Sequence, residues 1–257
     1  MSKDFNQAAL DYHEFPVPGK LSVELTKPAE TQHDLCLAYS PGVAAPVRAI
    51  AKCREDAYRY TGKGNLVAVI TDGSAILGLG NLGPLASKPV MEGKSLLFKR
   101  FARVNSVDIE VDAEHPQAFI ETVLRIAETF GGINLEDIKA PECFEIEKEL
   151  IRRCDIPVFH DDQHGTAIVT VAGVLNALEV QGKSLRQSKI VCLGAGAAAM
   201  ACCKLLMEAG ADLAKITLLD SKGVIHAGRQ DLNKYKREFA MVTDERDLDD
   251  AIADADI

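Results

Sequence analysis

The spacing of hydrophobic residues changes along the chain, and each change predicts a different kind of structure. Up to about Gly64, apolar residues are scattered among polar residues and prolines, which predicts short helices and loops. Residues 65–70 form a nearly continuous apolar run followed by Asp72-Gly73, which predicts a buried strand and a turn. Beyond this point short apolar runs alternate with longer amphipathic stretches, so we expect strands to alternate with helices.

The next predicted elements lie between residues 89 and 159. Helices are predicted at residues 89–101, 116–130 and 141–155, and strands at residues 107–111, 133–135 and 156–159. The spacing of apolar residues in two of the helices follows the helical period and predicts buried faces. These residues are Phe119, Val123, Ala127 and Phe130 in the first helix, and Cys143, Ile146, Leu150 and Cys154 in the second.

The last third of the chain has the same alternation. A long apolar helix is predicted from Gly165 to Leu178, strands at residues 190–193 and 215–219, and a turn and helix at residues 194–209. Residues 248–255 begin as a helix, and Asp256-Ile257 resembles the entry to a strand. This alternation predicts an α/β fold with a parallel, doubly wound sheet.

We expect two domains, at residues 1–164 and 165–257. The second is a Rossmann-type domain, and such domains normally have two halves. Only about one strand-helix-strand unit of it is present, so we expect this sequence to stop within the fold.

Composition and charge exclude several classes of protein. The chain has 257 residues, of which 47% are hydrophobic and 26% charged, with a formal net charge of -9. An acidic protein is a poor general binder of nucleic acid or of anionic membranes. No apolar run reaches the ~18 residues that span a bilayer, and the N-terminus lacks an apolar signal core. The seven cysteines include no CxxC pair, which favours reduced thiols. We therefore expect a cytoplasmic protein.

A dinucleotide-binding loop is predicted at the start of the second domain. The residues Gly194-Ala195-Gly196-Ala197-Ala198-Ala199 fit the pattern G-x-G-x-x-[GA], with a predicted strand before them and a helix after them. Gly194 permits a tight turn, Gly196 lets the backbone approach a pyrophosphate, and Ala199 allows close packing of the helix. The phosphates would lie at the helix N-terminus, where free N–H groups favour anions.

The choice between NAD and NADP stays open in the sequence. Asp220 ends the next predicted strand and would favour NAD if it bound the ribose hydroxyls. Ser221 and Lys222 follow it and would instead suit the 2′-phosphate of NADP.

Two acidic pairs follow two neighbouring predicted strands. Glu136-Asp137 follows residues 133–135, and Asp161-Asp162 follows residues 156–159. A helix separates the strands, so they should run parallel and bring both pairs to one edge of the sheet. Carboxylates gathered there suit Mg²⁺ or Mn²⁺. The alternatives are that Asp137 or Asp162 caps a following helix, or that His160 and His164 belong to a zinc site.

Seven motifs are spread over nearly the whole chain. They are residues 39–43, 77–83, 89–94, 135–137, 160–167, 194–199 and 220–223. In this order the motifs resemble those of the malic enzymes. They look most like the bacterial, small-subunit NADP-type enzymes, including forms fused to a phosphotransacetylase-like region.

The resemblance implies roles for individual residues. Tyr39 matches a proton-donating tyrosine, Lys94 a general-base lysine near the start of a helix, and Asp161 an acid that accompanies the lysine. The metal ligands would be Glu136, Asp137 and Asp162. The residues implied in cofactor binding are Ile76, Gly78, Gly80, Gly83, Thr166, Gly194, Ala195, Gly196, Ala197, Ala198, Asp220 and Lys222.

The activity implied is the oxidative decarboxylation of L-malate to pyruvate and CO₂. The cofactors would be Mg²⁺ or Mn²⁺ with NADP or NAD, and the protein would form a homodimer or a larger homo-oligomer. Two alternatives remain: a malolactic-type enzyme, which releases lactate from the same kind of site, and a cofactor-binding fragment without turnover.

Overall fold

The computed structural model describes residues 3–76 and 78–257 and has an α/β fold with two sheets. Its residues group into two compact units. The first comprises residues 1–134 and 150–158, and the second comprises residues 135–149 and 159–257. No helix among the described residues is long and apolar enough to cross a membrane.

The N-terminal part of the first unit is helical, as predicted. Its α-helices are α1 (Lys3–Glu14), α2 (Gln32–Ala38), α3 (Ala44–Lys52) and α4 (Ala57–Tyr60). A capping box starts α2, in which Thr31 and Asp34 bond each other's backbone N–H groups. Helices α2, α3 and α4 contain no buried residue.

The four-stranded sheet follows these helices and has the order β2-β1-β3-β4. Its strands are β1 (Leu66–Thr71), β2 (Asn105–Glu110), β3 (Gly132–Leu135) and β4 (Val158–His160). Strands β1 and β2 run parallel. Ala68, Val69 and Ile70 are fully buried, as expected for a strand covered on both faces.

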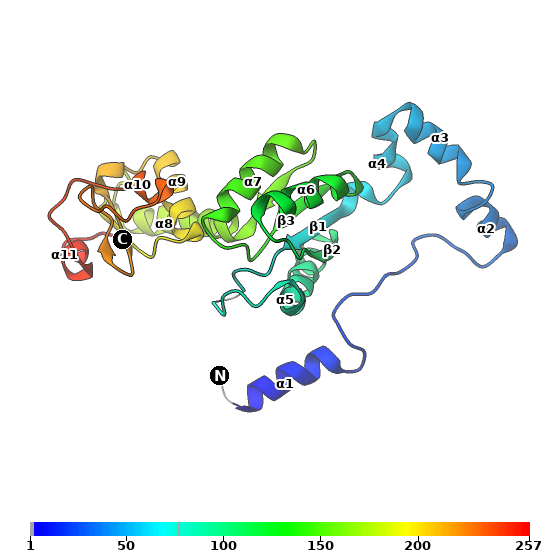
Figure 1. Cartoon of the computed structure of the whole chain (residues 1–257), viewed down its shortest axis with the longest axis horizontal. Helices are drawn as coiled ribbons and strands as arrows, with labels where there is room; N and C mark the ends of the chain where they lie inside the picture. Colours follow the sequence, from blue (N-terminus) through cyan, green and yellow to red (C-terminus); the bar gives the residue numbers. More distant parts are fainter. Residues whose placement is uncertain (1–2, 77) are drawn as a thin grey trace. The chain divides into compact units, whose positions relative to one another are not determined.

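Helices cover both faces of this sheet. Figure 1 shows α5 (Pro84–Leu97) on one side of β1 and β2 and α6 (Pro116–Ile126) on the other. The apolar face predicted for residues 116–130 is confirmed as buried, although α6 ends at Ile126 and two of the four residues follow it. The four residues are Phe119, Val123, Ala127 and Phe130.

Four sequence predictions need correction here. Helix α5 begins at Pro84, not at Pro89, which lies inside the helix. Lys94 is therefore in the last turn of α5 and not near its start. Strand β4 begins at Val158, two residues later than predicted. Helix α7 (Glu142–Arg153) buries Cys143, Ile146 and Leu150, but Cys154 follows the helix and is only half-buried.

The second unit contains the Rossmann-like sheet, with the order β5-β6-β7. Strands β5 (Ile190–Leu193) and β6 (Ile216–Asp220) are parallel, and the short β7 (Gly223–Val224), which was not predicted, is antiparallel to β6. Helix α8 (Thr166–Gln181) precedes this sheet. Asp256 and Ile257, where the entry to a further strand is predicted, are not assigned to a strand, although Val191 N–H donates to the carbonyl of Ile257, 2.9 Å away.

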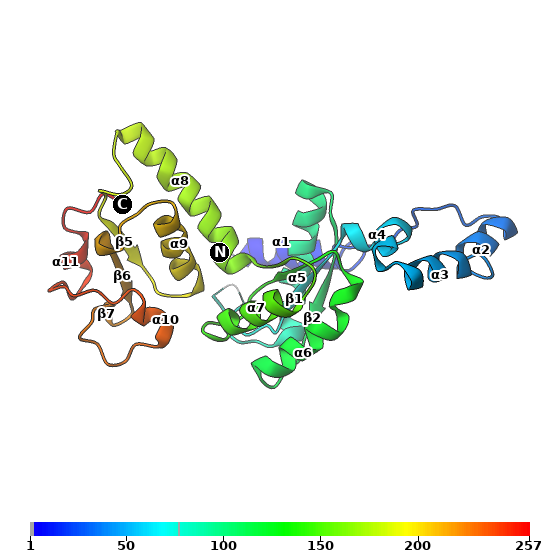
Figure 2. The same ribbon diagram turned by 90° about the horizontal axis from the view of Figure 1, so that it is seen from above.

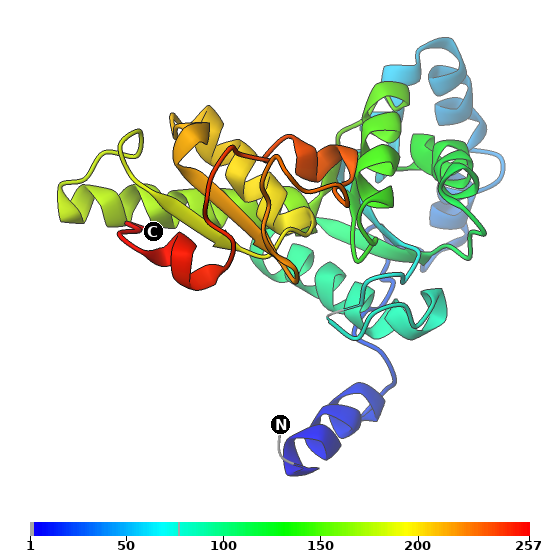
Figure 3. The ribbon, with the colours of Figure 1, turned by 60° about the vertical axis from the view of Figure 1, so that its left-hand side comes forward.

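Alternate side chains of this sheet enter two apolar clusters. Leu218 packs in the larger cluster with residues of α8 and α9 (Ala197–Glu208), whereas its neighbour Leu219 packs with Ala251 of α11 (Leu248–Ile252). Figures 2 and 3 show α9 along one side of the strands. The remaining α-helix, α10 (Lys234–Arg237), is short.

Candidate active site

Three residues of the two acidic pairs come together in the second unit, and the metal-binding cluster that they form does not include Asp161. Glu136 and Asp137 directly follow β3, and Asp162 lies in the turn η5 (Asp161–Gly165) that directly follows β4. One carboxylate oxygen from each of these three residues lies within 4.8 Å of the others. Glu136 and Asp137 are buried, and the Asp162 side chain is 36% exposed. Strands β3 and β4 are neighbours, which explains why the groups meet.

A backbone hydrogen bond links two of these three residues. The N–H group of Asp137 donates a 2.8 Å hydrogen bond to Oδ2 of Asp162. Asp137 has φ of 52°, a left-handed conformation that is rare for residues other than glycine. Such strained residues concentrate at functional sites, because the surrounding structure must hold them in place.

Neither aspartate is the cap of a following helix. The N-cap of α8 is Gly165, without a side-chain hydrogen bond, and α7 begins at Glu142, five residues after Asp137. The structure therefore removes the capping alternative for this pair of residues.

His160 and His164, which lie nearby, are not in the surroundings that a zinc site requires. His160 is fully buried, and burial lowers its pKa to about 4, so its ring is neutral near pH 7. His164 lies 2.7 Å from Oε1 of Glu147 through its Nε2 atom. Within residues 3–76 and 78–257, the one cluster of three or more metal-binding side chains contains only carboxylates. That donor set suits a hard cation and not zinc.

Lys94 and Tyr39 belong to the first unit. Lys94 is half-buried in the last turn of α5. Tyr39 is the C-cap residue of α2, and it is 76% exposed. A tight turn follows Tyr39, since a Cβ atom on Gly42 would run into the backbone of Cys36 and Leu37.

The glycine-rich loop before α5 also lies in the first unit. Ile76 is buried and its N–H donates to the carbonyl of Gly80 at 3.0 Å. Gly78, Gly80 and Gly83 all have φ near +80°, a region that glycine enters without strain. Leu77, part of the motif at residues 77–83, lies outside the described residues.

The predicted dinucleotide loop has the expected local geometry in the second unit. Gly194 follows β5 with φ of 120°, and Gly196 is the N-cap of α9. A Cβ atom on either glycine would meet nothing within 4 Å, so the backbone faces open space. No side chain caps α9, which leaves its first N–H groups to an outside acceptor such as a phosphate. Ala195, Ala197 and Ala198 are half-buried around this turn, and Thr166 is exposed as the first residue of α8.

Asp220 is surrounded by cations at the end of β6. Its Oδ1 accepts from Nη1 of Arg229 at 2.8 Å and from the backbone N–H of Lys222 at 2.9 Å. Its Oδ2 accepts from Nη2 of Arg229 at 3.1 Å and from Nζ of Lys236 at 2.7 Å. These bonds, first those from Arg229, hold the pKa of Asp220 well below its usual range. The carboxylate is thus ionised and engaged by groups of its own chain.

Lys222 points to a different partner. Its Nζ lies 2.8 Å from Oδ2 of Asp231, which also accepts from Arg229 at 2.9 Å. Three cations and two carboxylates therefore form one network here, with a net charge of +1. They are Lys222, Arg229, Lys236, Asp220 and Asp231.

Comparison with known proteins identifies the family. The malic enzyme N-terminal domain matches residues 18–151, and the malic enzyme NAD-binding domain matches residues 163–255. The chain belongs to the malic enzyme family.

Individual malic enzymes are similar over nearly the whole chain. An NADP-dependent malic enzyme of Halomonas elongata is 72% identical over 98% of this chain, which spans 60% of that protein. One from Escherichia coli is 57% identical over 100% of this chain, which spans 34% of that protein. The crystal structure of malic enzyme from Pyrococcus horikoshii superposes with a TM-score of 0.92 at 45% identity, covering 98% of this chain and 61% of that one.

Three charged residues near the predicted groups were not predicted from the sequence. Glu147 was detectable in principle, since it is a charge beside the apolar stripe of α7 formed by Cys143, Ile146 and Leu150. Arg229 lies in the loop between β7 and α10, and Lys236 lies in α10. They are nine and sixteen residues beyond Asp220, and no sequence pattern marks them.

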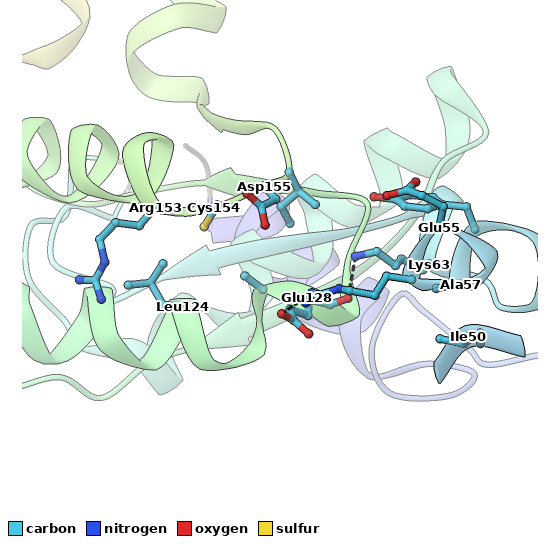
Figure 4. Close-up of a pocket in the computed structure, with 13 residues that line it drawn as sticks. Ile50, Glu55, Ala57, Lys63, Leu124, Glu128, Arg153, Cys154 and Asp155 are labelled. Carbon is cyan, nitrogen blue, oxygen red and sulfur yellow. Dashed lines mark hydrogen bonds and ion pairs between the residues drawn. The ribbon is translucent and has the colours of Figure 1, made fainter. Parts of the chain in front are cut away.

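A cavity of about 400 Å³ in the first unit is not the predicted site, because none of the predicted residues lines it. Figure 4 shows charged side chains around it. Arg54 is paired with Glu128 at 2.6 Å, and Nζ of Lys63 donates to the carbonyls of Glu128 and Phe130, each at 2.6 Å. Arg54, Lys63 and Glu128 therefore bond groups of their own chain at this cavity.

Proposed function

We propose that this protein oxidises and decarboxylates L-malate to pyruvate and CO₂ while reducing NADP⁺, with a divalent metal. The observation that carries the proposal is the meeting of Glu136, Asp137 and Asp162 in a chain of the malic enzyme family. The proposed domains are a metal- and substrate-binding region at residues 1–164 and a cofactor-binding region at residues 165–257. The seven free thiols fit the proposed cytoplasmic location.

The three carboxylates fit Mg²⁺ or Mn²⁺ as ligands. One carboxylate oxygen of each residue lies within 4.8 Å of the others, so Glu136, Asp137 and Asp162 would together be able to hold one such cation. When bound, such an ion acts as a Lewis acid that polarises a substrate oxygen and stabilises negative charge on it.

The proton transfers are assigned to two residues of the first unit. Nζ of Lys94 is proposed to accept the proton of the C2 hydroxyl as malate is oxidised, which is the work of a general base. Oη of Tyr39 is proposed to return a proton to C3 when pyruvate forms. Asp161, in turn η5, is proposed as the third catalytic residue.

The cofactor is proposed to bind through backbone groups. The N-terminus of α9, with Gly194 and Gly196 before it, would bind the pyrophosphate. The loop with Ile76, Gly78, Gly80 and Gly83, and Thr166 at the start of α8, are proposed as further cofactor contacts.

We propose a preference for NADP over NAD. An acid at the end of this strand favours NAD by accepting hydrogen bonds from the ribose, but the oxygens of Asp220 already accept four hydrogen bonds. The net positive charge of its network favours a 2′-phosphate instead. The name of the similar Halomonas protein, an NADP-dependent malic enzyme, also supports this preference.

The variant Lys236→Ala tests the cofactor preference. We expect KM for NADP⁺ to rise about 10-fold, because a charge-assisted bond to phosphate contributes about 1.5 kcal/mol, while KM for NAD⁺ stays unchanged. Steady-state kinetics with both cofactors measures this. Lys204→Ala, a lysine of α9 paired with Glu238 on the surface, is the control. An equal rise of KM for both cofactors would contradict a role in phosphate recognition.

A homodimer or larger homo-oligomer is also proposed. Helices α2, α3 and α4 bury no residue, and they leave apolar side chains exposed. These are Leu35, Leu37, Val47, Tyr58 and Tyr60. An exposed apolar surface of this kind is typical of a protein–protein interface, and sedimentation equilibrium would measure the assembly.

The activity itself is tested with L-malate, Mn²⁺ and either cofactor. We expect malate-dependent formation of NADPH and pyruvate, abolished by EDTA and restored by Mn²⁺. Lactate without net NADPH would instead indicate a malolactic enzyme. Binding of NADP⁺ and Mn²⁺ without turnover would indicate a cofactor-binding fragment, and either result would refute the proposal.

A further inference from the structure

Glu147 is a buried carboxylate on α7 that has no part in the activity proposed above. It is only 7% exposed and stands beside the buried apolar stripe of the helix. A charge in such surroundings is destabilising unless hydrogen bonds compensate for the lost hydration. Glu147 is therefore expected to have hydrogen-bond partners that compensate for its burial.

Both oxygens of Glu147 are used, and both bonds go to the same turn. Oε1 lies 2.7 Å from Nε2 of His164, and Oε2 accepts from Nε2 of Gln163 at 3.1 Å. Gln163 and His164 are neighbours in η5, the turn that also contains Asp161 and Asp162. Two bonds to adjacent residues restrain the orientation of η5 relative to α7 as well as the distance between them.

The turn is of a kind that needs such support. Residues 161–165 form a single π-helical turn, a rare conformation that is frequent at functional sites. The turn is also tightly packed, because a Cβ atom on Gly165 would collide with the carboxylate of Asp161. A small displacement of η5 would move Asp162 directly.

Asp162 has to be held against repulsion. Its carboxylate lies close to those of Glu136 and Asp137, and like charges repel unless a cation stands between them. The N–H group of Asp137 holds Oδ2 of Asp162 from one side, and the bonds of Glu147 hold the turn from the other. Ligands fixed in this way need less rearrangement when an ion binds.

The thiol beside Glu147 does not compete as a ligand. Burial, together with the charges of Glu147 and Asp162, raises the pKa of Cys143 to about 12. Cys143 therefore stays a neutral thiol near pH 7, and the thiolate is the form that binds metals.

We propose that Glu147 is a positioning residue of the metal site, which holds Asp162 in place through Gln163 and His164. This inference rests on the proposed metal-dependent function. Glu147 is not one of the three residues whose carboxylate oxygens gather at this site, and its own two oxygens bond the turn. Partners of this kind typically change metal affinity by 10- to 100-fold when removed.

The test is a titration with Mn²⁺, followed by electron paramagnetic resonance of the free ion. We expect Kd for Mn²⁺ to rise about 10-fold in Glu147→Ala and by a smaller factor in Glu147→Gln, which keeps the size and one acceptor. Glu145→Ala, at an exposed position of the same helix, is the matched control and should bind like the wild type. Kd for NADPH, measured by fluorescence, should stay unchanged and shows that each variant is folded.

A double-mutant cycle tests the route through the turn. His164→Ala should weaken Mn²⁺ binding, and adding Glu147→Ala should then weaken it much less than in the wild-type background. The inference would be overturned if Glu147→Ala had equal effects in both backgrounds. It would also be overturned if both Glu147 variants bound Mn²⁺ with the wild-type Kd. Neither result would refute the metal site itself. Failure of the wild-type protein to bind Mn²⁺ would refute the proposed function, and this role with it.

Discussion

Replacing Lys94 with alanine is expected to lower kcat for malate-dependent NADP⁺ reduction by about 1000-fold, within the range typical of a lost general base. The physical reason is that the C2 hydroxyl would have to lose its proton to water while the hydride leaves. Kd for NADPH should remain unchanged, because the loss concerns the proton transfer and not the cofactor. Stopped-flow and steady-state absorbance of NADPH would measure the effect.

A second lysine of the same region provides the control for Lys94. Lys99, in the π-helical turn η3 (Phe98–Ala102) directly after α5, donates to Asn105 Oδ1 at 2.6 Å. Lys99→Ala removes the same charge and a similar side chain, and it should keep kcat within about twofold of the wild type. Near-normal kcat in Lys94→Ala, or an equal loss in both variants, would remove Lys94 from the proposed mechanism.

The variant Asp162→Asn is expected to raise Kd for Mn²⁺ by about 100-fold or more, since removing groups outside the ligand set already costs 10- to 100-fold. Asparagine keeps an oxygen that can accept from the N–H of Asp137, so the turn should stay in place. What is lost is one negative charge at the ion. Isothermal titration calorimetry with Mn²⁺ measures Kd.

Asp249→Asn, an exposed aspartate of α11, is the control for this charge change. The protein should bind Mn²⁺ with the wild-type Kd in that variant. An unchanged Kd in Asp162→Asn would show that the ion binds elsewhere.

The sequence predicted the strands better than it predicted the start of α5. Apolar runs such as Ala68, Val69 and Ile70 predicted a buried strand, because both sides of a parallel strand are covered. The predicted start of α5 was wrong because the sequence contains two prolines, Pro84 and Pro89, and either could occupy the first turn of a helix. Pro84 occupies it, whereas Pro89 lies inside the helix and its carbonyl accepts from Nζ of Lys20 at 2.9 Å. That contact joins residues far apart in the sequence.

For the candidate site, the positions of residues that follow from topology were predictable from the sequence, whereas the side-chain partners of those residues were not. The meeting of Glu136, Asp137 and Asp162 follows from a strand-helix-strand unit, whose parallel strands end at the same edge. Asp220 was a candidate ribose ligand by its position after β6. Its partner Arg229 comes from a loop that no periodic pattern describes, so the ion pair was not predictable.

The proposed activity depends on one cation bound by carboxylates from two neighbouring strand ends. A crystal soaked in Mn²⁺ and measured near the manganese absorption edge tests this directly. We predict one strong anomalous peak within about 2.0–2.6 Å of oxygens of Glu136, Asp137 and Asp162, the distances at which divalent cations bind oxygen. Peaks only elsewhere, with these three carboxylates uncoordinated, would contradict the account.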